Sequence, residues 1–80
     1  MICTTDNYTY VLFKTNIITE DYMVQTYGIK IIGENEFAMF EDISRDYDSV
    51  LRLFNLIIEG ELSPVHLKDM IEDFLVLEKL

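Results

Sequence analysis

The stretch that decides the fold is NYTYVLFKTNIITEDYMVQTYGIKII, residues 7–32. Its two halves, 7–18 and 22–32, are rich in Tyr, Val, Ile and Thr, the residues that suit a pleated, half-buried surface. The residues between them, 19–21, are typical of a short hairpin turn, although they lack the usual glycine. The segment therefore predicts two antiparallel strands, and the rest of a sheet can be built outward from them.

A three-residue turn would pair residue 18 with residue 22 and would set Val11 opposite Ile29. The loop 33–35 then leads to a third strand over 36–42, and pairing 32 with 36 keeps the same face apolar. We therefore expect a three-stranded antiparallel meander. Its predicted core face carries Val11, Phe13, Ile17, Met23, Tyr27, Ile29, Ile31, Phe37 and Met39.

The other face of this meander is also rich in apolar side chains. A solvated sheet face usually alternates toward polar residues, and a large exposed apolar patch marks an interaction site. We expect this second face to remain outside and to form an interface. Its candidate interface residues are Tyr8, Tyr10, Leu12, Tyr22, Val24, Ile32 and Phe40.

The second half of the chain predicts two helices. Apolar residues recur at helical spacing over about 45–59, with Ser44 as the N-cap and Gly60 as the C-terminal cap. Ser63 then caps a second helix that has Pro64 at its first position. We therefore expect an α+β fold in the order β-β-β-α-α, with an antiparallel helical hairpin packed on one sheet face. The single domain covers 1–80, with the meander over 1–43 and the hairpin over 44–80.

The sequence GELSPVHLKDMIEDFL, residues 60–75, contains the only histidine and the only proline of the chain. His66 is the third helical residue after Ser63, where a neutral imidazole can accept a hydrogen bond from the cap backbone. His66, Asp69 and Asp73 also lie near one edge of the helix, so a metal site or an acid–base pair is conceivable. One helix supplies few ligands, and we interpret Ser63, Pro64 and His66 as a helix start.

No other motif points to catalysis. Asp42, Asp46 and Asp48 superficially suggest a calcium loop, but the segment lacks the glycine at the sixth position and the bidentate glutamate at the twelfth, so the match fails. The single cysteine, Cys3, excludes an internal disulfide and a cysteine-based zinc site. Walker, Rossmann and nucleophile-elbow sequences are absent. We predict a protein that is not an enzyme, with no catalytic residue, no metal and no cofactor.

The charge is strongly acidic and uneven, at −9 in total with a pI near 4.2. Residues 1–33 carry three acids and two lysines, a net of −1, whereas residues 34–80 carry twelve acids and four bases, a net of −8. Such a surface repels phosphate backbones, so we expect no nucleic-acid partner. We also expect no membrane segment and no signal peptide, and hence a cytoplasmic protein.

The segments TYGIKII, EDIS and ELSPVHLKDMIEDFL resemble those of a family of short clostridia-type (Firmicutes) bacterial proteins catalogued as a domain of unknown function. The resemblance runs from about Tyr8 to Leu75. It implies a cytoplasmic bacterial protein. It implies no activity, substrate or residue role.

These observations favour a small protein–protein interaction or regulatory module that forms a homodimer, or binds another protein, through the uncovered sheet face. Two alternatives of other classes stay open at this point. One is an acidic inhibitor or nucleic-acid mimic that blocks a basic groove through the helical half. The other is a minimal metal-dependent enzyme built around His66.

Overall fold

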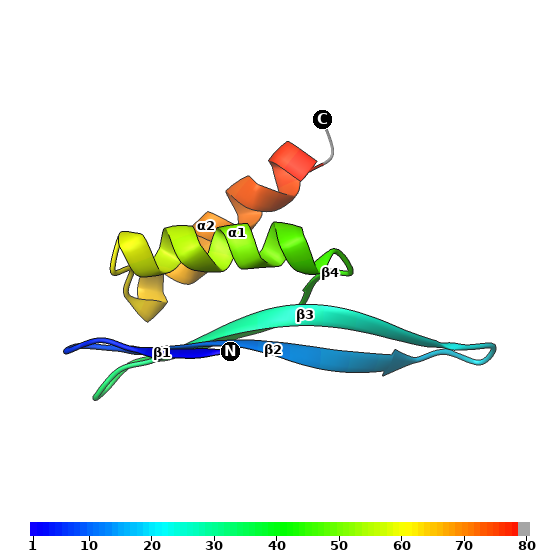
Figure 1. Cartoon of the computed structure of the whole chain (residues 1–80), viewed down its shortest axis with the longest axis horizontal. Helices are drawn as coiled ribbons and strands as arrows, with labels where there is room; N and C mark the ends of the chain where they lie inside the picture. Colours follow the sequence, from blue (N-terminus) through cyan, green and yellow to red (C-terminus); the bar gives the residue numbers. More distant parts are fainter. Residues whose placement is uncertain (79–80) are drawn as a thin grey trace.

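The computed structural model describes residues 1–78 and contains one antiparallel sheet with both helices on the same side of it (Figure 1). The elements are β1 (Ile2–Thr4), β2 (Thr9–Ile18), β3 (Met23–Ile32), β4 (Phe37–Ser44), α1 (Tyr47–Glu59) and α2 (Pro64–Glu78). The sheet has the order β1-β2-β3-β4. The α+β class, with the strands before two helices, is confirmed. The predicted number of three strands is wrong, because the sheet has four.

The strand missed by the sequence analysis is β1. It pairs with the start of β2, with Ile2 opposite Val11 and Thr4 opposite Thr9. The turn between β1 and β2 is closed by Thr5, whose N–H donates to the carbonyl of Tyr8 at 2.8 Å. Three residues are too few to display a strand alternation, so the pattern of apolar residues gave no signal for β1.

The turn between β2 and β3 has four residues rather than three. Ile18 pairs with Met23, and the N–H of Thr19 donates to the carbonyl of Tyr22 at 2.9 Å. The hydroxyl of Thr19 donates to the same carbonyl at 2.8 Å. The predicted pairing of Val11 with Ile29 is therefore wrong by one residue, and Ile29 lies opposite Leu12.

The turn between β3 and β4 repeats this geometry. The N–H of Gly33 donates to the carbonyl of Glu36 at 2.8 Å, and Ile32 pairs with Phe37 rather than with Glu36. Because side chains alternate with a period of two, a one-residue slip against β3 turns the side chains of β2 and of β4 to the face opposite the predicted one. Tyr10 and Leu12 of β2, which the sequence analysis assigned to solvent, therefore pack against the helices, whereas Ile29 and Ile31 of β3 face the core as predicted.

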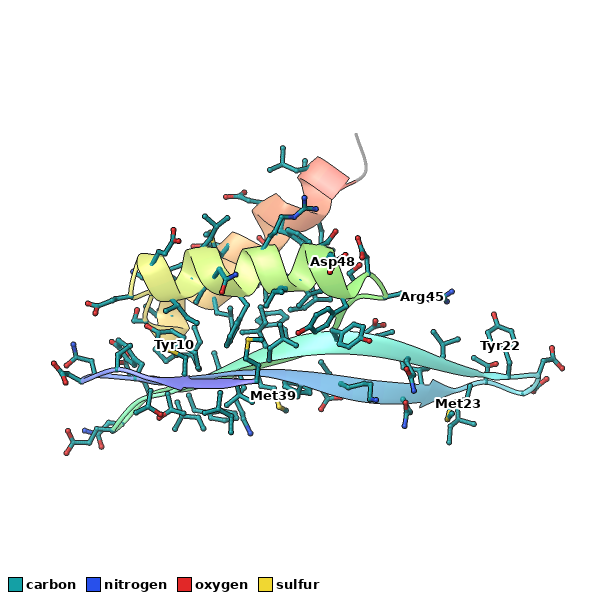
Figure 2. All side chains as sticks on the ribbon, in the orientation of Figure 1. Tyr10, Tyr22, Met23, Met39, Arg45 and Asp48 are labelled. Atoms are coloured by element: carbon teal, nitrogen blue, oxygen red, sulfur yellow. The ribbon has the colours of Figure 1, made fainter. Side chains whose placement is uncertain are left out.

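The core lies between this face and the helices. Tyr10, Leu12, Ile29 and Ile31 supply the sheet side, and Figure 2 shows Tyr10 in the space between the sheet and the helices. The hydroxyl of Tyr10 donates to the carbonyl of Leu62 at 3.0 Å and so connects the sheet to the turn between the helices. The remaining buried hydrophobic residues are Ile43, Val50, Leu53, Phe54, Ile57, Leu67 and Ile71.

The pairing of β3 with β4 contains a bulge. Ile29 lies opposite Phe40, but Tyr27 lies opposite Ser44, so β4 has two residues more than β3 in this interval. Beside the bulge, the carbonyl oxygens of β4 approach Gly28 closely. A Cβ atom at this position would meet these backbone oxygens, so the close approach requires glycine.

The boundaries of α1 differ from the prediction at its start. Ser44 belongs to β4, and the N-cap is Asp46, so the helix begins at Tyr47. The hydroxyl of Ser44 accepts a hydrogen bond from the N–H of Asp46 at 3.1 Å, which shapes the turn before the helix. The predicted Ser44 cap is therefore wrong, because the last strand extends two residues beyond its predicted end.

The end of α1 is a Schellman motif. Gly60 is the C-cap, as predicted, but it keeps a right-handed conformation with φ −84°. Glu61 takes the left-handed position with φ 46°. The N–H of Leu62 donates to the carbonyl of Ile57 at 3.1 Å, and that of Glu61 donates to Ile58 at 3.0 Å. The predicted start of α2 at Pro64 is confirmed.

The two helices cover the sheet unequally. α1 runs along the sheet, whereas α2 returns in roughly the opposite direction and rises away from the sheet toward its end (Figure 1). Leu67 and Ile71, in the first half of α2, are buried, whereas Val76 and Leu77 near its end are exposed. The tip of the β2–β3 hairpin extends beyond the helices (Figure 1).

Candidate interaction surface: the open face of the sheet

The side of the sheet away from the helices carries a second set of apolar side chains. We call it the open face. The strand register places Ile2, Val11, Lys30 and Met39 in one row across all four strands, and Thr4, Thr9, Ile32 and Phe37 in the next row. Toward the hairpin tip, Phe13 and then the pair Ile17 and Val24 continue the same face.

The large side chains of the open face are accessible to water. Phe37 is 62% exposed, Met39 is 42% exposed and Ile2 is 70% exposed. Figure 2 shows a fringe of side chains below the sheet around Met39, on the side opposite the helices. A contiguous apolar surface of this kind is uncommon on soluble monomers, which makes the open face the candidate interaction surface.

The open face is also nearly free of charge. Strands β1 to β3 contain no acidic residue, and their two lysines are Lys14 and Lys30. The register places Lys30 on the open face and Lys14 on the helix side. The acids of the sheet, Glu41 and Asp42, lie in the bulge of β4, between its paired residues Phe40 and Ser44.

A family model described as "Family of unknown function (DUF6514)" matches residues 2–77. This chain belongs to the DUF6514 family. The matched range includes all four strands and nearly all of the second helix, so the family corresponds to the whole α+β unit. No curated protein and no solved structure matches the chain.

In the DUF6514 structure, most of the residues predicted for the interface lie outside the open face. Val24 and Ile32 lie on the open face, as predicted, but Tyr10 and Leu12 are buried in the core. Phe40 packs half-buried against the same core. The prediction of Tyr10, Leu12 and Phe40 as interface residues is therefore wrong, because each turn contains one residue more than assumed.

The two remaining predicted interface residues lie in or next to turns. Tyr22 is exposed at the hairpin tip. Tyr8 is half-buried, with its ring edge-on to that of Tyr10 at 6.1 Å between centroids. Its hydroxyl donates to Oε2 of Glu36 at 3.3 Å, which joins the first and third turns. Tyr8 therefore connects the turns at this end of the sheet through its contacts with Tyr10 and Glu36.

The open-face residues that the sequence analysis assigned to the core include Val11, Phe13, Phe37 and Met39. A signal that could have placed them correctly is a repeated turn sequence, Thr-x-x-Tyr. It occurs at residues 5–8 and again at residues 19–22, and in both the threonine bonds the tyrosine carbonyl. Treating both as four-residue turns gives the observed register.

Two tyrosines of the DUF6514 chain have displaced pKa values. Burial raises the pKa of Tyr10, and the negative charge of Glu61 adds to the effect. Burial also raises the pKa of Tyr8, where the Glu36 carboxylate acts in the same direction. Both phenols donate hydrogen bonds within the fold, Tyr10 to the carbonyl of Leu62 and Tyr8 to the carboxylate of Glu36.

The helix-start residues do not form a site in the described part of the chain. The N–H of His66 donates to the carbonyl of Ser63 at 3.1 Å, while its side chain is exposed. Asp69 and Asp73 are exposed on the same helix. Residues 1–78 contain no group of three or more His, Cys, Asp or Glu side chains that could hold a metal ion.

The other sequence candidates have local roles. Cys3 is half-buried in β1, opposite Tyr10. Asp46, at the N-cap, accepts a 2.6 Å hydrogen bond from the hydroxyl of Ser49, and Asp48 lies in the first turn of α1. Asp42 lies in β4. These carboxylates belong to different elements and do not form a calcium loop.

Shallow hollows occur on the helix side of the DUF6514 structure. One of about 390 Å³ is lined by Met1, Leu12, Lys14, Tyr27 and Tyr47. Another, of about 280 Å³, lies between the helices and is lined by Arg52, Leu53, Leu56, Phe74 and Leu77. Each has one cationic side chain among mostly apolar neighbours. Within the described residues, neither helix is long and apolar enough to cross a membrane.

Proposed function

We propose that this DUF6514 protein is a non-enzymatic interaction module that binds a protein surface through its open face. The observation that carries the proposal is the exposure of Phe37, Met39 and Ile2 in adjacent rows of the sheet. Keeping large apolar side chains in water is unfavourable, and a partner surface would remove this cost. An 80-residue chain also has a small core that cannot enclose every apolar side chain.

Support for a non-catalytic role comes from the ionisable groups. Catalytic acids and bases usually have strongly shifted pKa values and converge on a cleft. Among the described residues, the groups with a displaced pKa are Tyr8 and Tyr10, and each hydroxyl is engaged by the fold. The open face itself offers Lys30 and threonine hydroxyls, a set suited to recognition.

Site-specific photo-crosslinking in the native cell tests this proposal. A photoreactive phenylalanine analogue at position 39 should give covalent adducts with protein, because Met39 lies within the proposed interface. The matched control is the same analogue at position 65, since Val65 is more accessible than Met39, at 70% exposure, but lies on α2. Absence of adducts at position 39, or the same adducts at both positions, would overturn the proposal.

A second candidate function follows from the charge of the helical half. The helices and the turn between them expose Asp48, Glu59, Glu61, Asp69, Glu72 and Asp73. Arg52 and Lys68 oppose them, and Lys68 lies 4.0 Å from Glu72. An acidic inhibitor of a basic groove would use this surface, and its binding would weaken steeply with salt. Binding through the open face would change little with salt.

We place the protein in the cytoplasm of a clostridia-type bacterium as part of the same proposal. The resemblance of TYGIKII and ELSPVHLKDMIEDFL to that family supports this location. The single cysteine agrees with a reducing compartment, where structural disulfides are rare. Cell fractionation with an antibody to the protein checks the location, and recovery from the membrane or the medium would contradict it.

A further inference from the structure

We infer that the partner on the open face is a second copy of this chain, packed face to face around a two-fold axis parallel to the strands. This inference rests on the proposed function and adds the identity and orientation of the partner. Three features of the open face carry it: its charge, its size and the order of side chains within its rows.

The charge distribution favours a second copy over other partners. With a formal charge of −9, two copies repel each other when their acidic parts approach. The acids lie in the turns, the bulged end of β4 and the helical half, whereas β1 to β3 contain none. The open face is thus the surface on which a like-charged copy meets the least repulsion. A basic partner would be drawn to the helical half instead.

The size of the open face is close to what a dimer needs. Strands spaced about 4.8 Å apart that rise about 3.4 Å per residue give these four strands a flat area of roughly 500 Å². Specific interfaces bury about 600–1,000 Å² on each partner. Side chains that stand out from this plane add accessible area, so the open face approaches the lower end of this range without any contribution from the helices.

The order of side chains within each row makes the face complementary to itself. The row Thr4, Thr9, Ile32, Phe37 changes from small to large across the sheet. A two-fold axis parallel to the strands places β4 of one copy over β1 of the other, so each row meets itself in reverse order. Phe37 then covers Thr4 of the second copy, and the large side chains fill the space above the small ones.

The same axis also keeps Lys30 of one copy away from Lys30 of the other. In the row Ile2, Val11, Lys30, Met39, the reversed copy sets Ile2 against Met39 and Lys30 against Val11. The aliphatic stem of Lys30 can lie over Val11 while its ammonium group reaches the solvent. An axis in the plane of the sheet and perpendicular to the strands would instead set β4 over β4 with the two strands running in opposite directions, and Phe37 would no longer face Thr4.

Sedimentation and light scattering give the first test. The wild-type protein should have twice the 9.4 kDa mass of the chain, and its association should persist or strengthen with salt as repulsion is screened. Met39→Asp should weaken association by roughly tenfold or more, because a carboxylate would be buried without a partner. Phe37→Ser, at a more exposed position, should weaken it as well. Val65→Asp is the matched control and should leave the dimer intact.

Short bismaleimide crosslinking tests the axis. In a Cys3→Ser background, the double variant Ile2→Cys and Met39→Cys should give a covalent dimer on a denaturing gel. Met39→Cys alone should give none, because the two copies of β4 lie on opposite sides of the interface. Efficient crosslinking of the single variant would overturn the assigned axis.

Hydrogen exchange of backbone amides distinguishes a dimer that packs through the open faces from one that pairs through strand edges. β1 is short, and the N–H of Leu12 donates to Met1, so the N–H groups of Lys14, Asn16 and Ile18 point to the same uncovered edge of β2. These amides should exchange equally fast in monomer and dimer. Their protection on association would overturn face-to-face packing.

A monomer at the highest soluble concentration would also overturn the inference, as would a dimer that Met39→Asp leaves unchanged. The result that contradicts the proposed function is different from the one that contradicts the homodimer. If the wild type is monomeric but position 39 crosslinks to a different protein, the interaction module stands and its partner is not a second copy. If position 39 gives no adduct at all, both fail.

Discussion

The ring of Phe13, in β2, lies over Gly28, the residue that pairs with it in β3. The ring and the backbone of β4 together occupy the space that a side chain on residue 28 would need. A Cβ atom there would lie 2.7 Å from Cζ of Phe13 and 2.6 Å from the carbonyl oxygen of Glu41. The carbonyl oxygen of Phe40 would be closer still. The bulge in β4 and the glycine in β3 therefore depend on each other.

Gly28→Ala should destabilise the protein by about 2–4 kcal/mol, because the two carbonyl groups belong to the backbone and cannot rotate away. Urea denaturation followed by circular dichroism measures the loss. Gly60→Ala is the matched control, since its nearest contact would be 3.5 Å from the carbonyl oxygen of Leu56 and its φ is right-handed. Similar stability losses for the two variants would contradict the role assigned to the bulge.

Glu61→Gly should stabilise the protein by about 1 kcal/mol, because glycine adopts the left-handed conformation without the steric cost of a Cβ atom. The present φ of 46° at Glu61 imposes that cost. Thermal melting measures the gain, which corresponds to an increase in Tm of about 4–8 °C for a domain of this size. Glu59→Gly, at the last residue of α1, should lower the Tm, because glycine is less favourable than glutamate in a helix. A decrease for both variants would refute the prediction.

Tyr10→Phe should lower the free energy of unfolding by about 1–2 kcal/mol, since the carbonyl of Leu62 would lose a donor inside the protein. The hydroxyl of Tyr10 makes this bond at 3.0 Å, between β2 and the turn that joins the helices. Chemical denaturation monitors the change. Tyr22→Phe, at an exposed position in the hairpin turn, serves as the control and should change stability by less than about 0.5 kcal/mol.

Stability should decline in alkaline solution. Burial raises the folded-state pKa of Tyr10 and of Tyr8 above the value of about 10 in an unfolded chain. Below about pH 10 both states hold these protons, so the stabilising contribution is complete. Above that pH the unfolded chain releases protons first, and the contribution is lost as the pH rises through the folded-state pKa values. Urea titrations between neutral and alkaline pH should show this fall, and Tyr10→Phe should reduce its slope.

Thr26→Val should increase stability by about 1 kcal/mol, because it removes a hydroxyl that is buried without a hydrogen-bond partner. Thr26 is 2% exposed, and its Oγ1 has no partner among the described residues. Thr15→Val is the control, since Thr15 lies opposite Thr26 in the sheet but is only half-buried. A loss of stability in Thr26→Val would indicate that the hydroxyl is satisfied in solution.

The helical half was predictable because its signals are local. The apolar spacing after Asp46 and the Ser63-Pro64 start both act within a few residues, and α2 begins where expected. Gly60 correctly marked the end of α1, but the left-handed residue is Glu61. That shift depends on how the next turn bonds back to Ile57, which the identity of a single residue does not determine.

The sheet was predictable in class but not in register. Each strand alternates between two apolar sets, so the hydrophobic pattern of Tyr10 and Leu12 is no stronger than that of Val11 and Phe13. Only turn length decides between them, and one residue exchanges the core with the surface. The sequence analysis therefore assigned the side chains of β2 and β4 to the wrong sides of the sheet and those of β3, such as Val24 and Ile32, to the right ones.

The position of Met39 also makes the open face sensitive to peroxide. Its thioether is 42% exposed, and oxidation would convert it to a polar sulfoxide in the middle of an apolar row. Met70, packed against the core, is better shielded from the same reagent. A single oxygen atom added at Met39 would therefore alter this surface chemically while leaving the interior of the protein intact, and methionine sulfoxide reductase would reverse the change.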